Sequence, residues 1–229
     1  MKINRRAALA LAVGAPWFWV PRVVLANGQA GTVQKVEGDA TSRAAGGAAR
    51  KLEEKAPIYM GDTLATEADS ALSLLFADDT KFDIGQKASL VIDEFVYSPG
   101  SGGKIGTGIL KGSFRFVSGK IAAAKPETMV VRSPVATIGV RGTSVVGEVL
   151  DSSASFALVE PEGSARPTAI QVANAAGAVI IDQPGWGTDV AGPNVAPSPP
   201  YRWESQRING VIQSITNIQR VMIPRPRVR

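Results

Sequence analysis

The side chains most often used in catalysis are missing from this chain of 229 residues, which contains no Cys and no His. Without Cys there are no disulfides, thiolate zinc sites, iron–sulfur clusters or thiol nucleophiles. Without His there is no imidazole general base and no Ser-His-Asp triad. The composition therefore predicts a protein that is not an enzyme and that holds no cofactor or metal.

Two adjacent acidic pairs, Asp78-Asp79 and Asp93-Glu94, are the remaining candidates for carboxylate chemistry or calcium binding. Neighbouring side chains of a strand point to opposite faces, so neither pair brings its carboxylates together. Calcium loops repeat acidic residues at alternate positions, which these pairs do not. We expect Asp78-Asp79 to form a tight turn and Asp93-Glu94 to lie at the surface.

The glycine-rich run from Gly100 to Lys104 is similar to a phosphate-binding loop only in composition. A phosphate loop continues after its lysine with Ser or Thr and opens a helix, whereas Lys104 is followed by Ile105 and an alternating pattern. We expect this run to be the loop of a β-hairpin.

The formal net charge of +5 is concentrated at the two ends of the chain. Residues 1–30 carry four basic and no acidic side chains, and residues 201–229 carry six basic side chains and one acidic. The segment between them has a net charge of −4. A nucleic-acid-binding domain instead clusters basic residues on its folded surface, so we expect no nucleic-acid partner.

Residues 1–26 have the features of an export signal peptide. Lys2, Arg5 and Arg6 precede an apolar run, and small residues follow it up to Ala26. The adjacent arginines resemble a twin-arginine signal, and the Sec route is the other possibility. We expect cleavage after Ala26 and a periplasmic or secreted protein. The alternative is an uncleaved membrane anchor, which the Gly and Pro residues in the run disfavour.

From residue 31 to about residue 190, short apolar runs of period two alternate with Gly, Pro and Asp turns, which is typical of β-strands. Leu72, Leu74 and Phe76 share one face of such a run, and Phe114 and Phe116 share another. We predict an all-β domain over residues 27–191: an antiparallel-rich sandwich, jelly-roll-like fold or short β-roll. The Ala- and Gly-rich residues 40–49 are predicted to be a surface loop, and a strand is predicted to end at Leu110 before another begins at Ser113.

The pattern changes at residue 192. Residues 192–200 are rich in proline and predict an extended linker or strap. Residues 201–229 predict a basic helix and tail, because one face is apolar at three- and four-residue steps: Ile208, Val211, Ile212, Ile215, Ile218 and Met222. We expect this helix to pack on the sheet of its own domain. The alternative is contact with a partner or the membrane surface, aided by the arginines of residues 225–229.

The most distinctive stretch is VRSPVATIGVRGTSV, residues 131–145, in which Arg141 is the one charged residue of the run IGVRGTSV. A guanidinium has five donors, so Arg141 could hold carbonyls or a carboxylate where the chain turns. The other possibility is recognition of a carboxylate on a partner. We favour the structural role.

This stretch resembles the end of the FecR domain family, whose members finish with Thr/Ser-Pro-x-Ala-x-x-Gly-Val-Arg-Gly-Thr. Upstream, MGDTLATEADSALSLLFADDTKFDIGQKASLVI and LKGSFRFVSGKI are similar to two further elements of that family. The sequence has Asp79-Thr80 where the family usually has Gly-Ser, and Asp tolerates the left-handed conformation required there. The matching positions of the motifs are Gly61, Asp62, Gly139, Arg141, Gly142 and Thr143.

The resemblance implies a β-rich domain outside the inner membrane that acts in signalling or scaffolding through protein–protein contacts. The family's best-known members have a cytoplasmic anti-sigma region, for which the six residues before the apolar run leave no room. We therefore expect a stand-alone exported FecR-domain protein whose partner is an envelope protein. The alternative function is binding of a cell-wall polysaccharide, with Trp186 and Trp203 as the candidate glycan contacts.

Overall fold

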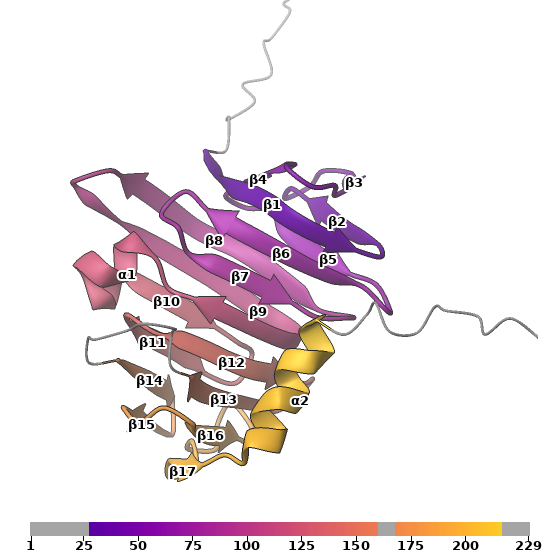
Figure 1. The fold of residues 1–229 in the computed structure, drawn as a ribbon. Helices are drawn as coiled ribbons and strands as arrows, with labels where there is room; N and C mark the ends of the chain where they lie inside the picture. Colours follow the sequence, from indigo (N-terminus) through magenta and orange to yellow (C-terminus); the bar gives the residue numbers. More distant parts are fainter. Residues whose placement is uncertain (1–27, 160–167, 217–229) are drawn as a thin grey trace, which may run out of the picture.

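The computed structural model describes residues 28–159 and 168–216, and these residues form two long β-sheets packed face to face (Figure 1). The all-β prediction is confirmed, and of the three architectures considered the structure is the antiparallel-rich sandwich. The predicted signal peptide and the tail beyond residue 216 lie outside the described residues.

The elements follow the predicted runs closely, with their bounds as follows. The strands are β1 (Gln29–Glu37), β2 (Ala40–Arg43), β3 (Ala49–Lys51), β4 (Pro57–Tyr59), β5 (Thr63–Thr66), β6 (Ala71–Phe76), β7 (Lys81–Ile84), β8 (Ser89–Ser98), β9 (Gly102–Val117), β10 (Met129–Arg132), β11 (Thr137–Arg141), β12 (Ser144–Val149), β13 (Ala154–Val159), β14 (Ala169–Asn174), β15 (Gly177–Ile181), β16 (Trp186–Val190) and β17 (Tyr201–Arg202). The helices are α1 (Lys120–Ala124), the 3-10 turn η1 (Pro126–Thr128) and α2 (Ser205–Thr216).

Each sheet contains nine of the described strands, and β9 belongs to both. The first sheet has the order β4-β1-β6-β7-β9-β12-β13-β16-β17. The second sheet has the order β3-β2-β5-β8-β9-β10-β11-β14-β15. Among these described ladders β9–β10 is the parallel one, and its connection passes through α1 and η1 as parallel pairing requires.

Strand β9 crosses from one sheet to the other without a break. Its residues 102–111 pair with β8, and its residues 112–117 pair with β12. Gly112 lies between these parts with a positive φ of 98°, and a Cβ there would lie 2.5 Å from the Cβ of Ala88. Glycine is needed for this bend. The predicted interruption between Leu110 and Ser113 is therefore wrong, because the chain changes sheet there and continues as one strand.

The core lies between the two sheets and is filled by the inward-facing residues of each strand. Phe82, Phe114, Phe116 and Phe156 are fully buried, with neighbouring ring centroids 5.4–6.2 Å apart. The alternation predicted for β6, β7 and the end of β9 is confirmed, because each of these strands buries every second side chain.

One local prediction is wrong in part, and one short helix was not predicted. Residues 40–49 were expected to form a loop, but Ala40–Arg43 pairs with both β3 and β5 as strand β2. Small residues carry little strand preference of their own, so the partner strands decide the conformation here. The sequence of the short helix α1 has no helical spacing of apolar residues from which it could be predicted. Its first turn is held by the buried carboxylate of Asp78, which accepts a hydrogen bond from the Ile121 N–H at 3.2 Å.

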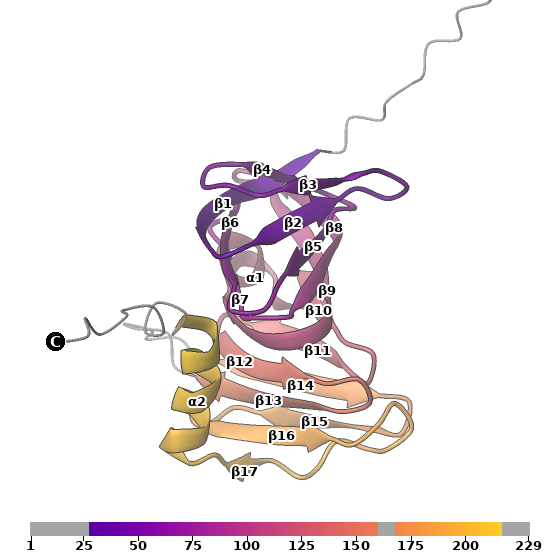
Figure 2. The same ribbon diagram turned by 90° about the vertical axis from the view of Figure 1, so that its right-hand side faces the viewer.

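Helix α2 packs on the outer face of the first sheet, as expected for the C-terminal segment (Figure 1 and Figure 2). Its apolar residues Ile208, Val211 and Ile212 contact a small cluster formed by Val146, Ala157 and Trp203. On the second sheet, the described α1 and η1 lie against β11.

Candidate functional site

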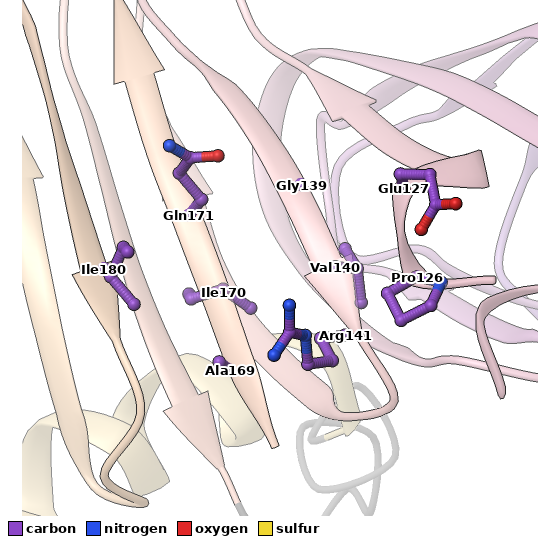
Figure 3. Close-up of a pocket in the computed structure, with 9 residues that line it drawn as sticks. All are labelled: Pro126, Glu127, Gly139, Val140, Arg141, Ala169, Ile170, Gln171 and Ile180. Carbon is purple, nitrogen blue, oxygen red and sulfur yellow. The ribbon is translucent and has the colours of Figure 1, made fainter. Parts of the chain in front are cut away.

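The exposed face of the second sheet carries an open groove of about 260 Å³ at the end of the distinctive motif (Figure 3). Four elements form it: η1, β11, β14 and β15. Its lining residues are Pro126, Glu127, Gly139, Val140, Arg141, Ala169, Ile170, Gln171 and Ile180. The groove crosses the strands, because Gly139 is paired with Gln171 and Gln171 with Ile180.

Gly139 forms the floor of this groove. It lies in the interior of β11, where glycine costs roughly 0.5–1 kcal/mol relative to alanine. Its φ is not positive, and a Cβ built on it has no heavy atom within 4 Å among the described residues. Neither backbone strain nor packing therefore requires glycine here. What glycine provides at this position is open space over the sheet.

Arg141 extends its guanidinium over β14 at the side of the groove (Figure 3). The residue is exposed, and within residues 28–159 and 168–216 it has no hydrogen-bond or ion-pair partner. Arg132 on the neighbouring strand, in contrast, faces Asp93 at 3.6 Å. The structural role favoured for Arg141 is not seen among these residues. The other possibility, recognition of a carboxylate on a partner, agrees with its exposure.

Gly142 and Thr143, the next two motif residues, have a structural role. Gly142 has a φ of 52° and turns the chain from β11 in the second sheet to β12 in the first. Thr143 is fully buried, and its N–H donates to the Ser118 hydroxyl at 2.8 Å. The Ser118 N–H in turn donates to the Thr143 carbonyl at 3.0 Å. These bonds fix the end of the strand that presents Gly139 and Arg141.

Gly61 and Asp62 lie in the other half of the molecule, at the turn between β4 and β5, and do not line the groove. The Asp62 side chain is buried. It accepts hydrogen bonds from the Ser42 hydroxyl at 2.8 Å, the Arg50 guanidinium at 3.0 Å and the Tyr59 N–H at 3.1 Å. This carboxylate therefore holds β2, β3 and β4 together.

The two tryptophans proposed as glycan contacts have different environments. Trp203 is 3% exposed and packs under α2, so its prediction as a glycan contact is wrong. Sugar binding needs an accessible aromatic face, and the guanidinium of Arg207 lies 3.7 Å from the ring centroid of Trp203. Trp186 is half-buried beside a second shallow cavity that also includes Ile180 and Pro200, and its glycan contact stays a prediction.

Arg207 also joins a polar cluster that the sequence did not reveal. Its guanidinium donates to the Asp189 carboxylate at 2.7 Å and to the Ser155 hydroxyl at 3.0 Å, and the Tyr201 hydroxyl donates to the same carboxylate. Burial alone would raise the pKa of Asp189, but the hydrogen bonds from Arg207, Ser155 and Tyr201 outweigh it and lower the pKa below its usual range. The cluster fastens the start of α2 to β13 and β16.

The lining residues Glu127, Gln171 and Ile180 were also not predicted from the sequence. They reach the groove through strand pairing and the β9–β10 connection, which no local pattern specifies. The uncharged run GAVII of β15 was a detectable signal, because its exposed positions are as apolar as its buried ones. Among the described residues there is no cluster of three His, Cys, Asp or Glu side chains able to hold a metal ion. In the same part of the chain, none of the helices combines the length and the apolar character needed to cross a membrane.

A family model described as FecR protein matches residues 62–166. The matched segment contains β9 and the whole of the groove-forming strand β11. The resemblance drawn from the motifs is thereby confirmed, and this segment is a FecR-type domain segment.

One solved structure has the same fold over about two thirds of this chain. A candidate anti-sigma factor from Parabacteroides distasonis aligns with a TM-score of 0.50 at 12% identity, over 66% of this chain and 64% of that chain. A second crystal structure of a candidate anti-sigma factor from this organism gives 0.49 at the same identity and coverage. A cell surface anchoring domain is 28% identical over 27% of this chain, with a TM-score of 0.26. No protein of curated function matches the sequence.

Proposed function

We propose that this chain is a non-enzymatic, extracytoplasmic signalling module that binds an envelope protein through the groove at Gly139 and Arg141. The FecR-type segment supports the regulatory part of this proposal, because that family serves in signalling and not in catalysis. The sequence of residues 1–26 supports the location, since it has the features of an export signal.

The observation that carries the proposal is an exposed guanidinium beside an open groove, with no partner among residues 28–159 and 168–216. Charged side chains that serve the fold are normally paired, as Arg132, Arg50 and Arg207 are here. Arg141 instead faces solvent on a strand whose glycine keeps the adjacent surface clear. A guanidinium binds a carboxylate through two parallel hydrogen bonds, and Ile180 offers an apolar contact at the end of the groove. The partner is therefore a protein segment that presents an acidic and an apolar side chain.

Substitution of the groove residues tests this function directly. We expect Gly139→Val to block the floor and Arg141→Gln to remove the cation, each weakening capture of the partner from an envelope fraction at least tenfold, or about 1.4 kcal/mol. Gly139 meets open space and Arg141 is exposed without a partner among the described residues, so neither change should lower the unfolding temperature. Thr137→Val is the matched control, because Thr137 is exposed on the same strand but does not line the groove.

Two results would contradict the proposal. If no envelope protein is enriched by the native chain after cross-linking, a protein-binding function is wrong. If a partner is enriched equally by all three variants, the function stands but the groove is not its interface.

A further inference from the structure

Strand β15 ends the second sheet with an edge that has no partner strand among the described residues. It pairs with β14 on one side. On the other side, none of the backbone hydrogen bonds formed outside the ladders by the described residues involves residues 177–181. Its N–H and C=O groups on that side therefore have no backbone partner among the described residues, and the linker residue Ala196 lies against Gly177 at the start of the strand.

The other three edges of the two sheets are protected in ways that β15 is not. Natural sheets block their edges with charge, proline or very short strands. The edge strand β3 has the sequence ARK, β4 is three residues long and begins with Pro57, and β17 is two residues long with Arg202. β15 has five uncharged residues, GAVII, and its Ile180 side chain is 65% exposed.

We propose that β15 pairs antiparallel with β15 of a second copy of this chain, about a twofold axis that passes midway between the facing Val179 residues of the two copies. In this register Ala178 lies opposite Ile180 of the second copy, and Gly177 lies opposite its Ile181. Each large side chain therefore meets a small one, on both faces of the pair. The next position places Asp182 opposite Ala176, so no like charges face each other. Because small side chains lie opposite large ones and no like charges face each other, the edge favours a second copy of this chain over an unrelated strand.

Such a pair would join the second sheet of one copy to the second sheet of the other as one continuous sheet. The twofold axis is perpendicular to that sheet, so both grooves open on the same face of the dimer. Ile180 lines the groove and would lie beside Ala178 of the second copy, which extends the groove floor across the axis. This consequence for binding rests on the proposed function, whereas the pairing itself does not.

The oligomeric state of the purified full chain tests the pairing without any partner protein. We expect a dimer by sedimentation equilibrium over about 1 µM to about 100 µM, and at least a tenfold weaker association for Ile180→Lys. Leu110→Lys is the matched control, because Leu110 is 48% exposed in the interior of the same sheet, on β9. The double variant A178E/I180K should restore the dimer, since each new glutamate lies opposite a new lysine in the proposed register.

A cysteine pair reports the register itself. The chain has no native Cys, so Val179→Cys provides one thiol per copy. Residues directly opposite in an antiparallel pair have Cα atoms about 4.5–5.5 Å apart, which suits a disulfide. We expect a covalent dimer from Val179→Cys under mild oxidation and none from Leu110→Cys. A monomeric native chain, an Ile180→Lys variant that associates as the native chain does, or an unlinked Val179→Cys would each overturn the proposal. All three results are independent of whether an envelope partner exists.

Discussion

At the scale of single residues, the family motifs divide into positions that hold the fold and positions that are open to a partner. Asp62 belongs to the first kind, because its buried carboxylate accepts three hydrogen bonds from three separate strands or their ends. Arg141 belongs to the second kind, because its guanidinium is exposed on the surface of the sheet. Two motif residues of equally polar character thus have opposite roles.

Asp62→Asn should lower the free energy of unfolding by about 1.5–3 kcal/mol, the usual contribution of hydrogen bonds to a charged group. All three donors share one carboxylate oxygen, Oδ2, so the amide oxygen of asparagine can replace the acceptor but not the negative charge that strengthens these bonds and pairs with Arg50. Urea unfolding at neutral pH measures the loss. Asp39→Asn is the control, since it removes the fully exposed pair between Asp39 and Lys51 and should change the unfolding free energy much less. Equal losses in the two variants would show that Asp62 does not hold these strands together.

The sequence allowed some of these roles to be predicted and not others. The left-handed conformation expected of Asp79 is confirmed, with a φ of 67°, because turn chemistry is a local property. The burial of Asp78 and its hydrogen bond to the first turn of α1 join residues 43 positions apart, which no local pattern shows. The role of Arg141 depends on what surrounds it in space, so the sequence left two possibilities.

At the scale of elements, strand alternation was a good guide wherever both faces of a strand differ. It placed β6 and β7 correctly, but it missed β2 in an Ala- and Gly-rich stretch and split β9 at Gly112. The three- and four-residue spacing of apolar residues predicted α2, which we expected to pack on the sheet of its own domain. The surface on which this helix packs could not be predicted. It depends on Gly187, which lies in contact with the indole of Trp203.

Gly187→Ala should dislodge Trp203 and loosen α2. An added Cβ would overlap the Trp203 indole and lie 2.5 Å from the Phe156 carbonyl oxygen, so we expect a loss of about 1–3 kcal/mol in unfolding free energy. Tryptophan fluorescence should shift to the red as the indole becomes exposed. Gly210→Ala in α2 is the matched control, since it meets open space and should raise stability by roughly 0.5–1 kcal/mol. A Gly187→Ala variant with native fluorescence and stability would mean that this contact does not position the helix.

At the scale of the whole molecule, the two halves of the sequence are also two halves in space. Strands β1 to β8 form one end of the sandwich and β10 to β17 the other, and β9 lies between them in both sheets (Figure 1). The sequence indicated the all-β class, with the sandwich as one of three architectures, but not this order. Order depends on which strand edges pair, and many strands here have similar apolar patterns.

Unfolding of the two halves should be a single transition, because β9 connects the cores of both. The described tryptophans, Trp186 and Trp203, lie in the second half, whereas far-UV circular dichroism reports strands of both halves. We expect the urea midpoints from fluorescence and from circular dichroism to coincide. Two separate midpoints would show that the halves unfold independently and that β9 does not couple them.

The position of β9 also has a consequence for biosynthesis. When a nascent chain has reached about residue 117, β9 has its partners β7 and β8 on one side, but its other side still exposes unpaired amide groups, toward β10 in the second sheet and toward β12 in the first. Aggregation usually starts at unpaired strand edges. The half-synthesised polypeptide is therefore its most vulnerable form, and a chaperone would be of greatest use at that moment.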